Sequence, residues 1–316
     1  MVVAAVLPFL LPAASVAQVV PPPQLKPVGP PLFVITVKGQ AGFIDPHGKI
    51  VIAPIFENVL PFSDGLAAVQ QDGLWGFIDT KGRMVIEPRF GKVGSFSDGF
   101  ALVGDRGASD SWGYMDKTGA VVIKPRFDCA EEFRNGIARV GFETLESKLL
   151  RWIADVGTSC EYRFIDRTGK FVPAPSLTHY ATGEPGELIP FTKDGMAGYI
   201  DADGRVVIEP KFQYGSAFSD GLACVCQEGL YGYIDKRGTW VIPARFKYPS
   251  DFSEGLAGVP LGDKSWGFID RTGKVVIPAR FGYVLNGFRH GVAEVVLDGQ
   301  RGLINTKGEW VWRPPE

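Results

Sequence analysis

The stretch Trp75-Gly76-Phe77-Ile78-Asp79 decides the fold, because variants of it recur along the whole chain. Eight copies occur, and their second residues are separated by 34, 37, 50, 35, 34, 35 and 35 positions. These second residues are Gly42, Gly76, Gly113, Arg163, Gly198, Gly232, Gly267 and Gly302. A period near 35 residues indicates one small unit used repeatedly, which buries its apolar face only against its neighbours. We number the units one to eight in chain order.

Each unit begins with a predicted β-hairpin. In unit two, residues 76–79 and 83–86 are short apolar strands separated by Thr80-Lys81-Gly82. Asp79 at the first turn position and Gly82 at the fourth are typical of a type I turn followed by a left-handed glycine. The turn glycine is present in all eight units, at Gly48, Gly82, Gly119, Gly169, Gly204, Gly238, Gly273 and Gly308.

A proline and a phenylalanine follow the hairpin, as in Ile86-Glu87-Pro88-Arg89-Phe90. Because proline cannot donate to a sheet ladder, we expect it to end the second strand. The proline arrives one residue earlier in units six and seven, whereas the phenylalanine keeps its place. This behaviour predicts a packing role for the phenylalanines, which are Phe56, Phe90, Phe127, Phe212, Phe246 and Phe281.

A second turn and a third strand complete the unit. Phe96-Ser97-Asp98-Gly99 has the residue types of a tight reversal, and the strand after it begins at Phe100. The tryptophans that precede the motif glycine, Trp75, Trp112 and Trp266, allow two interpretations: packing against the hairpin, or a platform on which sugars or bases stack. Packing is favoured, because Ala41, Ala197 and Arg301 occupy the same position.

The repeated unit resembles the bacterial WG β-repeat family. The resemblance rests on Trp-Gly-Phe-Ile-Asp, on the glycine turn with its Val-Ile-x-Pro-x-Phe continuation, and on Phe-Ser-(Asp/Glu)-Gly-Leu-Ala. It implies an all-β repeat array that mediates interactions, and it supplies no catalytic residues. The fourth copy departs from the pattern: Arg163 replaces the glycine, Pro173-Ala174-Pro175 replaces the usual tail, and no equivalent phenylalanine follows.

The sequence thus predicts an all-β array of about eight hairpin or three-stranded units. It begins at a third strand, residues 33–37, and stops at a second strand, residues 310–312. An open, curved, solenoid-like array is favoured over a closed, propeller-like ring, because three strands are few for a propeller blade.

The segments before the repeats predict export. Residues 1–17 carry no charged side chain and end in Ser15-Val16-Ala17, which is typical of a signal peptide although a basic start is missing. Residues 18–31 form a proline-rich linker, and residues 32–316 form the repeat domain. No later apolar run is long enough to span a bilayer. We therefore expect a periplasmic or extracellular protein, or a cytoplasmic one if residues 1–17 are not a signal.

Insertions are expected near residues 141–161 and 176–187. The first carries an apolar stripe at helical spacing, Leu145, Leu149, Trp152, Ile153 and Val156, which indicates one short helix; an extended hairpin is the alternative. Cys129 and Cys160 flank this insertion and could form a disulfide in an exported protein. Cys224 and Cys226 lie on one face of a strand and are interpreted as packed thiols.

Composition argues against several function classes. The net charge is −2 and no run of Lys or Arg occurs, so we expect no nucleic-acid partner. None of the three histidines belongs to a metal-binding spacing or a catalytic triad pattern, so no metal, cofactor or catalytic residue is assigned. The repeated hairpin aspartates are explained by their turns rather than by calcium.

Two functions remain. The first is a non-enzymatic binding scaffold of the cell envelope or exterior, which presents its β surface to a protein or a polysaccharide. The second is a hydrolase-like enzyme with its site at the unit-four insertion, built from Glu143, Glu146, Asp155 or His179. Loops on a repeat scaffold are where such specific chemistry would concentrate.

Overall fold

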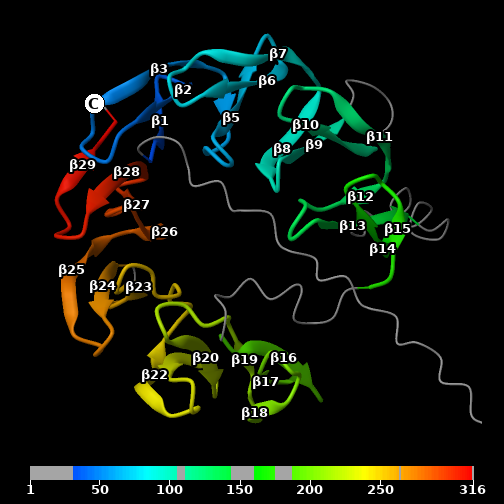
Figure 1. Ribbon diagram of the computed structural model, residues 1–316. Coiled ribbons are helices and arrows are strands. Elements are labelled where there is room, and N and C mark those ends of the chain that lie inside the picture. Colours follow the sequence, from blue (N-terminus) through cyan, green and yellow to red (C-terminus); the bar gives the residue numbers. More distant parts are fainter. Residues whose placement is uncertain (1–30, 105–110, 144–159, 175–186, 263–264, 315–316) are drawn as a thin grey trace, which may run out of the picture.

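The computed structural model describes residues 31–104, 111–143, 160–174, 187–262 and 265–314. All regular secondary structure in these residues is β-strand, arranged in eight small antiparallel sheets around a common centre (Figure 1). The all-β repeat array is therefore confirmed. We number the sheets one to eight, so that each sheet carries the Trp-Gly motif of the unit with the same number.

The first four sheets come from the first half of the chain. Sheet one contains β1 (Phe33–Val37), β2 (Gln40–Ile44) and β3 (Ile50–Phe56). Sheet two contains β4 (Asn58–Val59), β5 (Leu66–Gln71), β6 (Leu74–Asp79) and β7 (Met84–Phe90). Sheet three contains β8 (Lys92–Ser97), β9 (Phe100–Gly104), β10 (Trp112–Asp116) and β11 (Val121–Phe127). Sheet four contains β12 (Cys129–Ala130), β13 (Ile137–Glu143), β14 (Cys160–Asp166) and β15 (Phe171–Val172).

The other four sheets follow in the same order. Sheet five contains β16 (Ile189–Lys193), β17 (Met196–Ile200) and β18 (Val206–Phe212). Sheet six contains β19 (Tyr214–Gly215), β20 (Ala223–Gln227), β21 (Leu230–Ile234) and β22 (Trp240–Phe246). Sheet seven contains β23 (Leu256–Pro260), β24 (Trp266–Asp270) and β25 (Val275–Phe281). Sheet eight contains β26 (Tyr283–Arg289), β27 (Val292–Leu297), β28 (Gln300–Asn305) and β29 (Trp310–Trp312).

Each sheet combines the third strand of one unit with the first two strands of the next. β1 pairs with β2, for example, and β5 pairs with β6. Five of the eight described sheets have a fourth, innermost strand, which forms from the chain just after the phenylalanine. Three of these extra strands are only two residues long, such as β4, which is too short to show a sequence pattern. The expectation of three strands per unit is thus too low for these sheets.

The proline does not end the second strand, contrary to the sequence prediction. β7 continues through Pro88 to Phe90, and Phe90 pairs with Trp75. Trp75 and Phe77 are two positions apart, whereas their partners Phe90 and Ile86 are four positions apart, so the outer strand bulges there. Proline is tolerated because the strand lies at the sheet edge and the bulge removes the need for its N–H.

The phenylalanines that follow the prolines fill the junctions between successive sheets. Phe56 packs with residues of sheets one and two, and Phe90 packs with residues of sheets two and three. The same arrangement places Phe127, Phe212, Phe246 and Phe281 in the next junctions, and all six side chains are at most 7% exposed.

The two ends of the repeat array meet. Ile35 and Ile44 of sheet one form a buried cluster with Val292 and Leu303 of sheet eight. Figure 1 shows these two sheets side by side. Among the described residues, no buried cluster joins sheet four to sheet five. The described sheets therefore form a ring with one junction that no buried cluster of described residues fills, which we call the open junction; it lies in the middle of the chain rather than at its termini.

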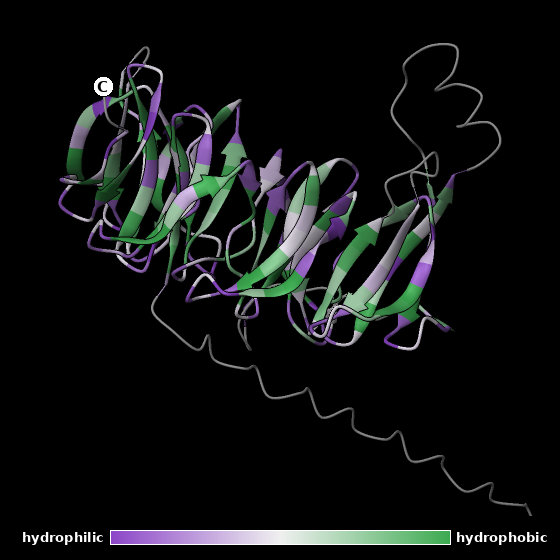
Figure 2. Ribbon diagram, turned by 90° about the horizontal axis from the view of Figure 1, so that it is seen from above, coloured by the Kyte–Doolittle hydropathy of each residue, from purple (hydrophilic) through white to green (hydrophobic). Residues whose placement is uncertain are grey.

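The sheets present two different ends. At the crossover end, the chain passes from the outer strand of one sheet to the inner strand of the next. At the turn end lie the Asp-x-x-Gly and Phe-Ser-Asp-Gly turns. Figure 2 views the ring from its side, so that the two ends face opposite directions.

Candidate binding surface

The turn end is held by hydrogen bonds that run from sheet to sheet. The Ser63 hydroxyl donates to the carbonyl oxygen of Phe96 at 2.6 Å, and the Asp64 carboxylate accepts from the N–H of Gly99 at 2.8 Å. The same pair of bonds links Ser97 and Asp98 to Phe133 and Gly136, Ser219 and Asp220 to Phe252 and Gly255, and Ser253 and Glu254 to Phe288 and Gly291. Repeated turn residues thus build a rigid frame.

This ladder of hydrogen bonds stops at two places. Arg134 and Asn135 stand where other units have serine and an acid in sheet four, and Arg289 and His290 stand there in sheet eight. The chain therefore divides into two halves of four sheets, residues 31–174 and 187–314. Ala41 and Ala197 take the tryptophan position in the first sheet of each half.

The turn glycines all have left-handed backbone, with φ between 77° and 86°. At seven of them, a Cβ would lie within 4 Å of side chains or backbone of the neighbouring sheet, whereas at Gly204 no described residue comes that close. The closest case is Gly48, where a Cβ would clash with the carbonyl oxygen of Val311 in sheet eight. The described residues of sheet four provide no such neighbour for Gly204, which lies at the open junction.

The hairpin aspartates serve the turns. The Asp116 carboxylate accepts the Thr118 hydroxyl at 2.6 Å and the N–H groups of Thr118 and Ala120. These hydrogen bonds, that of the Thr118 hydroxyl above all, lower the pKa of Asp116. Among the described residues, no three His, Cys, Asp or Glu side chains are placed to hold a metal ion.

The tryptophans of the motif are partly buried at the crossover end. Trp75, Trp112 and Trp266 each pack against the buried cluster between their own sheet and a neighbour. The ammonium group of Lys92 lies 4.2 Å from the Trp112 ring centroid, and Tyr283 contacts Trp266 edge-on at 4.9 Å. The three tryptophans therefore lie at the crossover end as partly buried side chains and do not project from it.

The two halves differ in what surrounds these rings. In the first half, cations lie over two of them: Lys92 over Trp112, and Arg139 over Tyr162 of unit four at 4.2 Å. In the second half, aromatic rings meet aromatic rings: Tyr214, Tyr231 and Tyr248 follow one another with centroid separations of 6.0 and 5.6 Å. The crossover end of the second half therefore carries exposed tyrosines, Tyr214, Tyr248 and Tyr283, that contact other aromatic rings.

Sequence reasoning did not identify this surface. Tyr214, Tyr248 and Tyr283 each follow a packing phenylalanine by two positions, in units five to seven. The spacing of 34 and 35 residues between them would have shown that they lie at equivalent places on successive sheets. Their counterparts in the first half are Asn58, Lys92 and Cys129.

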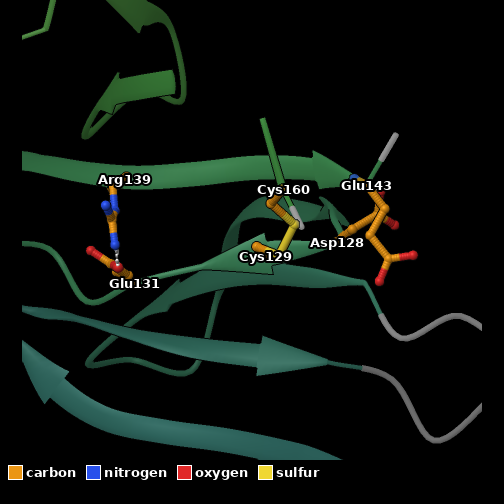
Figure 3. The surroundings of a disulfide bond; sticks show 6 residues. All are labelled: Asp128, Cys129, Glu131, Arg139, Glu143 and Cys160. Atoms are coloured by element: carbon orange, nitrogen blue, oxygen red, sulfur yellow. Dashed lines mark hydrogen bonds and ion pairs between the residues drawn. A yellow bond between two sulfur atoms is a disulfide. The ribbon is translucent and has the colours of Figure 1, made fainter. Parts of the chain in front are cut away.

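A disulfide joins Cys129 to Cys160 in sheet four, with Cα atoms 6.5 Å apart (Figure 3). β12 and β14 flank β13, and the bridge passes close to Gly141, where any side chain would clash with Cys160. Nearby, the Arg139 Nε donates to the Glu131 carboxylate at 2.9 Å. Cys224 and Cys226 are buried free thiols, and burial raises the pKa of Cys224 to about 12.

The residues of the hydrolase hypothesis do not form a described site. Glu143 ends β13, and its N–H donates to the Asp128 carboxylate at 2.9 Å. Glu146, Asp155, His179 and the expected helix lie outside the described residues. Two shallow depressions, one lined by Glu187, Leu188, Asp201, Ala202 and Asp203 and one by residues of sheet eight and Pro314, do not include Glu143.

Comparison with known proteins agrees with the repeat architecture. The profile of the WG containing repeat matches residues 42–75, 75–107, 112–142, 198–231, 231–264 and 266–300, more than half of the chain. The chain belongs to the WG containing repeat family. Three matches fall in each half, and residues 143–197 are skipped.

Solved structures with similar folds include a eukaryotic initiation factor, with a TM-score of 0.51, 11% identity, and 90% of this chain and 95% of that chain covered. BamB from Moraxella catarrhalis matches with a TM-score of 0.42, 11% identity, and 89% and 90% covered. These likenesses concern the fold alone. No curated protein matches the chain. The described residues contain no helix that is long and apolar enough to cross a membrane.

Proposed function

We propose that this protein is a non-enzymatic binding scaffold of the cell envelope or cell exterior, which presents the crossover end of its sheets to a protein or polysaccharide. The observation that carries the proposal is the contrast between the two ends. The turn end repeats the same serine and carboxylate hydrogen bonds between sheets. The crossover end varies from unit to unit at equivalent positions, such as Asn58, Lys92 and Tyr248.

This division suits recognition. Successive sheets bury six phenylalanines in their junctions, so the frame is rigid. Side chains at the crossover end extend from a frame that loses little conformational entropy on binding, which favours affinity. Repeat folds use such surfaces for extended contacts rather than for one deep site.

Two observations support export. The Cys129–Cys160 disulfide is of a kind that persists in oxidising compartments. Residues 1–17 have the composition of a signal segment. Together they favour the periplasm or the exterior over the cytoplasm.

The test uses the full chain expressed with its N-terminal segment. Fractionation should recover it outside the cytoplasm, shortened by about 17 residues at the N-terminus. The purified protein, immobilised and exposed to envelope extract, should retain one reproducible protein or polysaccharide without altering it. Cytoplasmic recovery at full length would contradict the location, and turnover of the retained molecule would contradict the non-enzymatic role.

A further inference from the structure

An aromatic row crosses the second half of the crossover end. Tyr214, Tyr231 and Tyr248 contact one another in order, and Trp266 contacts Tyr283 on the next two sheets; we call these five residues the aromatic row. Tyr248 is 75% exposed, Tyr214 is 51% exposed and Tyr283 is 50% exposed. Large aromatic side chains are costly to leave in water, so a repeated exposed set indicates a contact surface.

Packing against buried clusters accounts for Tyr231 and Trp266 but not for the exposed Tyr214, Tyr248 and Tyr283. Buried tyrosines of this protein anchor their hydroxyls: those of Tyr199 and Tyr233 donate to the carbonyl oxygens of Ser216 and Ser250 at 2.9 and 2.7 Å. Within the described residues, the hydroxyls of Tyr214, Tyr231, Tyr248 and Tyr283 make no hydrogen bond. These four side chains can therefore contact a ligand in two ways: the hydroxyl group can form a hydrogen bond, and the ring face can cover an apolar surface.

The chemistry of the row selects an uncharged ligand. In the part of the chain that the structure describes, no lysine or arginine lies over any of its five rings, in contrast to Lys92 over Trp112 and Arg139 over Tyr162 in the first half. Aromatic rings also stack on nucleic-acid bases, but single-stranded nucleic acid needs a basic groove to follow its backbone. The net charge of −2 and the uncovered rings argue against such a partner.

The shape of the row selects a polymer with alternating apolar and hydroxylated surfaces. The row extends over three successive sheets. Each strand that contributes to it provides only one ring, so the row is narrow. A protein partner usually covers about 800 Å² of each surface and brings a polar rim. A pyranose chain matches a narrow row better, since its C–H faces cover aromatic rings while its hydroxyls reach phenol edges.

We infer that the aromatic row binds an uncharged polysaccharide, with the rings of Tyr214, Tyr248 and Tyr283 covering sugar faces. The inference rests on the proposed binding function and assigns the ligand class and the residues to it. It also explains why the row is confined to the second half. In the first half, the equivalent positions hold the amide of Asn58, the cation of Lys92 and the disulfide-bonded Cys129.

The experiment is affinity electrophoresis of the full mature chain in native gels that contain a soluble mixed-linkage β-glucan, hydroxyethylcellulose or dextran. At least one of the three should retard the wild-type protein relative to a gel without polysaccharide. Tyr248→Ala should weaken that retardation roughly two- to tenfold, the range expected for one lost aromatic contact. Tyr248→Trp should preserve it, because the stacking face remains.

Lys92→Ala is the matched control, since Lys92 has the same repeat position in the first half, and it should leave retardation unchanged. Because Tyr248 is exposed and its hydroxyl bonds to no described residue, circular dichroism should show an intact fold in every Tyr248 variant. Retardation by none of the three polysaccharides, or equal retardation of Tyr248→Ala and wild type, would overturn the aromatic-row inference. Stable capture of a protein in the envelope experiment, with no polysaccharide retained, would overturn it too while leaving the scaffold proposal standing.

Discussion

The junction between sheets eight and one and the junction between sheets four and five occupy equivalent places in the two halves, yet among the described residues only the first is filled by a buried cluster. Ile35 and Val292 meet in a buried cluster, at 1% and 3% exposure. Their counterparts Phe191 and Ile137 remain partly exposed. Chain connectivity therefore does not decide which sheets pack, because the closed junction joins the two ends of the array.

The sequence difference lies four residues after the turn glycine. Sheet eight has Trp312 there, at the end of β29, and Trp312 packs against the cluster shared with sheet one. Sheet four has Pro173, and its last strand stops at Val172. A proline cannot extend the ladder and offers little apolar surface, so sheet four lacks the side chain that could fill the next junction.

Truncating one apolar side chain at each junction should lower the stability of the protein by different amounts. Ile35→Ala should lower the free energy of unfolding by about 2–5 kcal/mol, because it empties a closed cluster. Phe191→Ala should cost roughly half as much or less, since its side chain already contacts solvent. Urea unfolding followed by fluorescence measures both, and equal losses would show that the open junction is packed as tightly as the closed one.

The next effect concerns the disulfide beside the open junction. Replacing both Cys129 and Cys160 with serine should destabilise the protein by about 2–4 kcal/mol, because the unfolded chain regains the freedom that the crosslink removes. If reduction of wild type leaves its thermal midpoint where it was, the crosslink contributes nothing to sheet four.

Turn glycines give a sharper comparison. Gly48 and Gly204 have φ values of 84° and 79°, so alanine at either position introduces left-handed strain of about 1–2 kcal/mol. Gly48→Ala should cost more, since its Cβ also collides with the Val311 backbone. The measurement is the difference between the two unfolding midpoints. If both variants lost the same stability, a neighbouring group would have to lie as close to Gly204 as Val311 lies to Gly48.

Much of this arrangement was readable in the repeats. The positive φ values at the hairpin turns and the burial of the six phenylalanines follow from residue types at fixed spacing. The fourth copy departs from the repeat at Arg163 and Pro173, and it adjoins the open junction, but the sequence did not predict an opening there. The sequence could not show that the outer ends close, because that contact joins residues more than 250 positions apart, such as Ile35 and Val292.

The proline placement shows why local rules failed elsewhere. Proline usually marks the end of a strand, but a bulge on an edge strand accommodates Pro88 and lets pairing resume at Phe90. The aromatic row was missed for a different reason: a single tyrosine in each unit has no local pattern, and only alignment of the two halves reveals it. The insertions near residues 144–159 and 175–186 lie outside the described structure.

A smaller effect tests the inter-sheet ladder. Ser97→Ala removes the hydroxyl that donates to the Phe133 carbonyl at 2.7 Å, and it should cost about 1 kcal/mol. Arg134→Ala, at the equivalent turn position where the ladder stops, should cost less. A thermal scan of both variants decides this, and an equal shift would mean that the Ser97 bond adds nothing beyond its turn.

The smallest effect is one of pH. Hydrogen bonds hold the pKa of Asp116 below its usual value of 3.8, so its contribution is complete above that pH and is lost as pH falls through the lowered value. Asn305 of sheet eight accepts the same two backbone bonds without titrating. Asp116→Asn should therefore flatten the fall of the thermal midpoint below about pH 4, and an unchanged slope would exclude Asp116 as a contributor.

The packing of the two junctions can be measured by hydroxyl-radical footprinting of the native full-length chain in solution, read residue by residue by mass spectrometry. The comparison of one open and one closed junction predicts strong modification of Phe191 and Ile137, and protection of Ile35 and Val292 after correction for intrinsic reactivity. Equal protection of all four side chains would contradict it, because sheets four and five would then pack as sheets eight and one do.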